Sequence, residues 1–130
     1  MVTIVEPILN ELREEIPATR RVLERIPADK LAWKPHQKSR SLGELAMHIA
    51  NIPGMAERVA NSAEFTPGSV PPPSANSVEE IRAAFEKNAR TAEEVLSNIT
   101  EQTALGNWRL VFKGKRSSTN LASRYCERPC

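Results

Sequence analysis

The sequence predicts an all-α protein, because apolar side chains recur at helical spacing in three separate segments. Two of these segments begin with a capping box, in which a Ser is followed three residues later by a Glu at the start of a helix. The two boxes are Ser41 with Glu44 and Ser77 with Glu80. With 130 residues, 40% of them hydrophobic and 26% charged, the chain has the size and composition of a single globular domain.

The first helix is expected from about Glu6 to Ile26, with Pro7 in its first turn. Pro17 is expected to kink it, because proline lacks a backbone donor. Its apolar stripe comprises Ile8, Leu9, Leu12, Ile16, Val22, Leu23 and Ile26. The connector that follows, residues 27–40, contains Leu31 and Trp33, which we expect to fold back onto the core.

The second helix is expected from Ser41 to about Asn61, with a bend or break at Pro53–Gly54. A proline-rich loop, residues 65–76, is expected to be extended and mobile, and the third helix to run from Ser77 to about residue 99. Residues 108–113 alternate weakly and predict a short strand or an extended arm. We expect residues 1–113 to form the helical domain and residues 114–130 a basic, poorly ordered tail.

Three amphipathic helices leave one side of a bundle uncovered. A fourth helix would complete an up-down bundle, but residues 114–130 show little apolar periodicity. The predicted fold is therefore a helical bundle with an incomplete fourth helix. A homodimer is one arrangement that would cover the open side.

The charge distribution gives little indication of a macromolecular partner. A net charge of +2 is too small to indicate nucleic acid binding. Residues 113–128 carry five basic residues and one acidic residue, which fits either contact with phosphates or anionic lipids or an ordinary solvated end. No apolar run approaches the roughly 20 residues of a membrane span, and no signal peptide is visible, so a cytoplasmic protein is expected.

His48 is the main candidate for chemistry. Helical spacing places it on one face with Leu45, Ile49, Ile52 and Met55, and we expect that face to point inward. A buried imidazole must be hydrogen-bonded, titrating or bound to a metal. The alternatives are therefore a metal ligand and a histidine of the core or a groove with a hydrogen-bond partner.

Other candidate ligands are few. His36 precedes the second helix by five residues and is either a second ligand, a general base or a surface-loop histidine. Cys126 and Cys130 have the i, i+4 spacing of a chelating pair, although Pro129 argues against a regular helix there. No phosphate-binding glycine loop, nucleophile elbow or HExxH motif is present.

Several stretches resemble the DinB-like family of bacterial, DNA-damage-inducible four-helix bundles, which is related to the mycothiol- and bacillithiol-dependent transferases. They are Arg-Arg-Val-Leu-Glu-Arg-Ile-Pro at 20–27, Lys-Leu-Ala-Trp-Lys-Pro-His at 30–36, residues 39–49, and Pro53–Gly54. The resemblance covers about residues 1–113. It implies a nickel or zinc ion held by three histidines, of which His48 matches the one on the second helix. The other two belong to the last long helix and would lie beyond Cys130.

The resemblance implies a metal-dependent thiol transferase or hydrolase, in which the metal lowers the pKa of a thiol or water and the substrate is a thiol or another small molecule. Because two ligands are missing, we expect this chain to be catalytically incomplete. A non-catalytic helical binding or dimerisation module is the alternative. One codon choice for residues 121–130, read one base later, restores a family-like Leu-Pro-Arg-Val stretch, so a truncated or frame-shifted reading is a hypothesis that sequencing the gene would test.

Overall fold

The computed structural model describes residues 4–67, 72–112 and 115–119. Its main elements are two long helices, α1 (Val5–Glu24) and α4 (Val78–Asn98), and a broken helix formed by α2 (Leu42–Asn51) and α3 (Met55–Asn61). A short 3₁₀ turn, η1 (Ala28–Lys30), follows α1, and a single turn, α5 (Glu101–Ala104), follows α4. The predominance of helix confirms the predicted all-α bundle. Within the described residues there is no fourth long helix.

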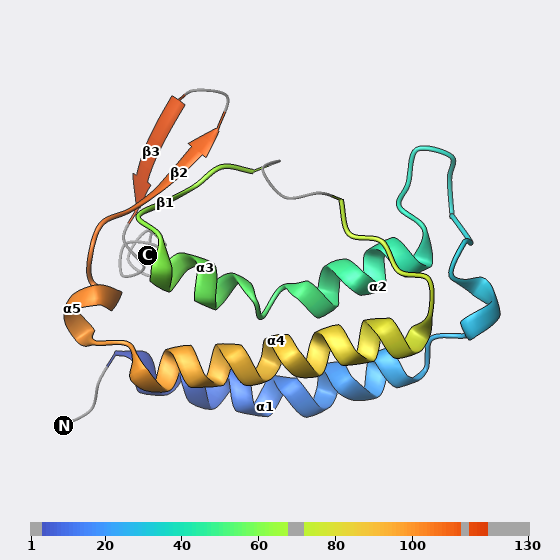
Figure 1. The fold of residues 1–130 in the computed structure, drawn as a ribbon, viewed down its shortest axis with the longest axis horizontal. Coiled ribbons are helices and arrows are strands. Elements are labelled where there is room, and N and C mark those ends of the chain that lie inside the picture. The colour runs from blue at the N-terminus through green and yellow to red at the C-terminus, as the bar shows by residue number, and fades with distance from the viewer. Residues whose placement is uncertain (1–3, 68–71, 113–114, 120–130) are drawn as a thin grey trace, which may run out of the picture.

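Helix α4 lies at the centre of the bundle. It contacts α1 along one side and α2 and α3 along another (Figure 1). α1 and α4 run in opposite directions, whereas α2 and α3 run in the same direction as α4 (Figure 1). The core lies where these helices meet and is made by Ile16, Leu23, Ala46, Met47, Ala50, Ile81, Phe85 and Ala89.

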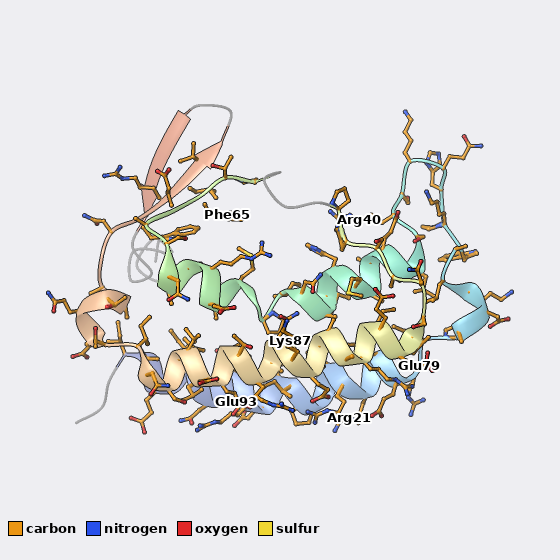
Figure 2. All side chains as sticks on the ribbon, in the orientation of Figure 1. Arg21, Arg40, Phe65, Glu79, Lys87 and Glu93 are labelled. Atoms are coloured by element: carbon orange, nitrogen blue, oxygen red, sulfur yellow. The ribbon has the colours of Figure 1, made fainter. Side chains whose placement is uncertain are left out.

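Helix α1 continues through Pro17 without ending. Ile16 and Leu23 are buried against α4, as predicted, but Val22 is 63% exposed and does not belong to the apolar contact. Charged side chains line the outer side of α1 and α4, where Figure 2 labels Arg21 and Glu93. Two ion pairs join the helices there, Arg13–Glu93 and Arg20–Glu86.

The predicted break at Pro53–Gly54 is confirmed, because α2 ends at Asn51 and α3 begins at Met55. At the break the Gly54 N–H donates to the oxygen of Asn51, which leaves the Ala50 carbonyl without its helical donor. Asn88 of α4 supplies one, since its Nδ2 donates to the Ala50 oxygen at 3.0 Å. The same nitrogen donates to Asn51 Oδ1 at 3.1 Å. Asn88 therefore joins α4 to the break.

Both predicted helix starts are present, with one difference between them. The box at Ser41 is complete: Ser41 Oγ accepts from Glu44 N–H at 3.1 Å, and Glu44 Oε2 accepts from Ser41 N–H at 2.7 Å. Ser77 Oγ likewise accepts from Glu80 N–H. The Glu80 carboxylate, however, accepts from the N–H of Asn76, one residue before the cap.

The connector between α1 and α2 is fixed at its base. The N–H groups of Leu42 and Gly43 donate to the oxygens of Trp33 and Leu31, each at 2.9 Å. A side chain at position 43 would lie 3.2 Å from the Leu31 oxygen, so the close approach favours glycine. Leu31 packs on the core as expected, but Trp33 is 57% exposed, so the prediction that it folds inward is wrong. Beyond Trp33 the loop extends away from the bundle, so the indole is not packed on the core (Figure 1).

A three-stranded sheet lies beside α3 in the order β1 (Glu64–Phe65), β2 (Trp108–Phe112) and β3 (Lys115–Thr119) (Figure 1). β1 is parallel to β2, with Glu64 opposite Arg109, and β2 is antiparallel to β3. The strand predicted at residues 108–113 is therefore confirmed, while β1 was expected to be loop. Of the predicted tail, residues 115–119 form β3, and residues 114 and 120–130 lie outside the described residues.

None of the described helices is both long enough and apolar enough to cross a bilayer.

Candidate functional site on the open face of α2

One face of α2 carries large apolar side chains and a histidine that no other described element covers. Leu45 is 47% exposed, Ile52 is 53% exposed, and His48 between them is also exposed. Their spacing of three and four residues places them on the same side of the helix. We call Leu45, His48 and Ile52 the open face of α2.

The expectation that the predicted face points into the core is wrong for Leu45, His48 and Ile52, whereas Ile49 of the same predicted face packs against the core. The buried side of α2 is formed instead by Ala46, Met47 and Ala50, which share the core with residues of α4, whereas the buried Gly43 lies against Leu31 of the connector. Small residues allow two helix backbones to approach closely, so α2 presents its small side to α4. The larger apolar residues then remain on the opposite side, with His48 among them.

The imidazole of His48 has no hydrogen-bond or ion-pair partner among the described residues. A neutral imidazole with an accessible ring nitrogen is a good ligand for nickel or zinc. An exposed imidazole also stays fully hydrated in the absence of a ligand, so the fold does not require it to bind one. His48 is therefore available for binding, and its structural context alone does not assign it a role.

His36 lies in the loop between η1 and α2. It is exposed, its Nδ1 accepts from the Lys38 N–H at 3.1 Å, and its carbonyl oxygen accepts from the Ser39 N–H. These contacts fit the surface-loop alternative. They organise the turn at the loop tip, and they leave the role of His36 as a second ligand a prediction.

Glu44 is the carboxylate nearest to His48 along the helix, and it already accepts a hydrogen bond. Glu44, one turn earlier, accepts from the N–H of Ser41, and this capping bond accounts for its position. Cys126 and Cys130 lie outside the described residues. Across residues 4–67, 72–112 and 115–119, no three His, Cys, Asp or Glu side chains gather into a group that could hold a metal.

The described residues therefore do not form a metal site by themselves. Protein sites for zinc use three or four protein ligands, and the open face of α2 supplies a single imidazole.

Sequence reasoning identified His48 but missed the apolar surface around it. A signal was present: Gly43, Ala46 and Ala50 recur at spacings of three and four residues, which marks a closely packed helix side. That side is rotated away from Leu45 and Ile52, so the two sets cannot both face the same neighbour. The prediction places Leu45 and Ile52 in the core because large apolar residues are the ones most often buried.

Comparison with known proteins gives one match. A family model described as the DinB superfamily matches residues 11–122. No curated protein and no solved structure is significantly similar to the chain. The match includes α2 with its open face, α3 and α4, and it spans most of the sequence. The chain belongs to the DinB superfamily.

Proposed function

We propose that the open face of α2 is the working surface of this protein and that His48 is its contribution to a metal-dependent site of the thiol transferase or hydrolase type. The observation that carries this proposal is the exposure of His48 between two exposed apolar side chains, Leu45 and Ile52. The apolar pair lowers the local polarity and gives a thiol or another small molecule a surface to contact. Membership of the superfamily supports the same choice of residue.

The proposed site needs ligands in addition to His48. They would come from residues outside the described ranges or from a second copy of the chain. We infer that the described part alone is catalytically incomplete, because one imidazole and water hold a divalent ion weakly. Nickel and zinc are the ions to test first, because both accept imidazole nitrogen.

Elemental analysis tests this proposal directly. Protein purified after growth with nickel and zinc would be measured beside the variants His48→Ala and His36→Ala. We expect metal in the parent protein and loss of most of it in His48→Ala, while His36→Ala, which removes the other exposed imidazole, shows whether His36 is a second ligand. Parent protein without metal, or His48→Ala with its full metal content, would contradict the proposal.

A second candidate function is a non-catalytic binding or dimerisation module. It is favoured by the exposure of Leu45 and Ile52, since monomeric proteins seldom leave large apolar side chains adjacent on one helix face. Light scattering of the parent protein and of Leu45→Lys/Ile52→Lys distinguishes this candidate. A dimer that dissociates in the double variant supports it, and Val22→Lys is the control, because Val22 is also apolar and 63% exposed but lies on α1.

A further inference from the structure

The segment from Lys30, the last residue of η1, to the start of α2 concentrates positive charge at one end of the molecule. From residue 30 to residue 40 the chain contains four basic residues and no acidic residue: Lys30, Lys34, Lys38 and Arg40. All four are exposed, and none forms an ion pair or a side-chain hydrogen bond within the described residues. We call these four residues together with Trp33 the basic loop. Figure 1 shows it rising from the end of the bundle where α1 stops and α2 starts.

The basic loop has a defined conformation. Its base is closed by the two backbone hydrogen bonds from Leu42 to Trp33 and from Gly43 to Leu31. Its tip is a turn in which the N–H of Ser39 donates to the His36 oxygen at 3.0 Å. Compact surface loops with closed ends often carry function. The four basic side chains therefore extend from a loop whose backbone is held by hydrogen bonds, which lowers the entropic cost of binding a polyanion.

Trp33 gives the basic loop a second means of contact. Its indole is 57% exposed at the base of the loop, in sequence between Lys30 and Lys34. An exposed aromatic ring among cations is the combination that binds single-stranded nucleic acid, since bases stack on the ring while the cations follow the phosphates. A membrane surface fits less well, because Trp33 is the single large apolar side chain that the loop exposes, and interfacial binding requires a broader apolar face.

The net charge of +2 does not oppose this interpretation, because the attraction of a polyanion depends on the charges close to it. Helix α4, with its 21 residues, is about 31 Å long, whereas electrostatic screening at physiological salt acts over about 8 Å. A polyanion at the basic loop therefore interacts with the positive charge of the loop and not with the net charge of the whole chain.

We propose that the basic loop binds single-stranded nucleic acid, with Lys30, Lys34, Lys38 and Arg40 on the phosphates and Trp33 stacked on a base. This inference is independent of the function proposed for His48. The net charge of the whole chain gave no such indication, because it averages over this local cluster.

Fluorescence anisotropy of a labelled single-stranded oligonucleotide of mixed sequence tests the proposal, with sodium chloride varied at each protein concentration. Four phosphate contacts predict that log K falls with log salt with a slope of about −3, and Lys34→Gln/Lys38→Gln should halve that slope. Trp33→Ala should weaken binding about tenfold, and Trp33→Phe should restore most of the loss. Lys87→Gln/Arg58→Gln removes the same charge from exposed positions outside the loop and should leave binding nearly unchanged.

Three outcomes would overturn the proposal. They are absence of oligonucleotide binding at low salt, equal weakening by the loop pair and the control pair, and binding to phosphatidylserine vesicles without binding to the oligonucleotide. The substituted side chains are exposed, so circular dichroism should show unchanged helix content in each variant.

Discussion

The α1–α4 interface and the open face of α2 contain similar residues in opposite environments. Leu23 of α1 is 1% exposed against α4, whereas Leu45 of α2 is 47% exposed. Both belong to regular helices with apolar side chains at helical spacing. Apolar spacing alone therefore does not show which face a helix buries. The position of the neighbouring helix decides which face is buried, and α4 packs against both α1 and α2.

The two regions also differ in how their positions are fixed. Two ion pairs, seven residues apart on each helix, join α1 to α4 at intervals of two turns. α2 is held by small residues that allow close approach and by the hydrogen bonds of Asn88 at its end. Burial and hydrogen bonding thus hold α2, while its open face makes no contribution to the fold and remains available for binding.

The largest effect should come from truncating the same residue type in the two regions. Leu23→Ala should lower the free energy of unfolding by about 3 kcal/mol, because it leaves a cavity in a closed interface. Leu45→Ala should change it by less than about 0.5 kcal/mol. Urea unfolding followed by circular dichroism measures both. Equal costs would mean that the open face is covered in solution.

This contrast also shows what the sequence could and could not predict. The helix starts at Ser41 and Ser77 and the break at Pro53–Gly54 were predictable, because capping and the missing proline donor act over a few residues of chain. The buried side of α2 was not, because it depends on how closely α4 approaches. His48 was accordingly identified as a residue but placed in the wrong environment.

The sheet shows the same limit. β2 was predictable in part from its weak alternation, but β1 comprises two residues and has no recognisable strand pattern. It forms because the chain after α3 lies beside β2, where the Arg109 N–H donates to the Ala63 oxygen at 3.0 Å. Such pairing is a tertiary contact, which a short sequence window does not encode.

The next largest effect should come from the hydrogen bonds at the end of α2. Asn88→Ala removes the donor to the carbonyl of fully buried Ala50 and should cost about 2 kcal/mol. Hydrogen exchange should then accelerate in α3 more than in α1. Asn98→Ala is the control, because its side chain caps an exposed carbonyl within its own helix and should cost less than about 0.5 kcal/mol. Uniform acceleration over all helices would contradict a local role for Asn88.

Gly54→Ala sharpens this prediction. A Cβ at position 54 would lie 2.8 Å from Asn88 Oδ1, so the substitution should displace Asn88 and cost about 1 kcal/mol. In the Asn88→Ala background this obstacle is absent and the Asn51 oxygen at 3.3 Å is the remaining close contact, so Gly54→Ala should cost less than in the parent protein. A double-mutant cycle measures the coupling. Additive costs would mean that the two residues act separately.

The smallest effect should come from the ion pairs of the α1–α4 interface. Arg20 donates to both carboxylate oxygens of Glu86, with Nη2 3.0 Å from Oε2, and this hydrogen bonding lowers the pKa of Glu86 from its ordinary 4.5. A carboxyl with a lowered pKa in the folded state stabilises fully above its unfolded pKa, and the contribution disappears as pH falls through the lowered value. Between pH 5 and pH 7, Glu86→Gln should therefore have a melting temperature about 2 °C below that of the parent protein. The effect is small because both side chains of the pair are partly exposed.

As pH falls through the lowered pKa of Glu86, the melting curves of Glu86→Gln and the parent protein should converge, because the parent carboxyl then becomes protonated. Glu93→Gln is the matched control: its pair with Arg13 is a single contact at 3.6 Å and should have a smaller effect at every pH. A Glu86→Gln difference that persists unchanged at low pH would show that Glu86 acts through packing on α1. The ion pairs would then not contribute to holding α1 against α4, and apolar burial alone would distinguish that interface from the open face of α2.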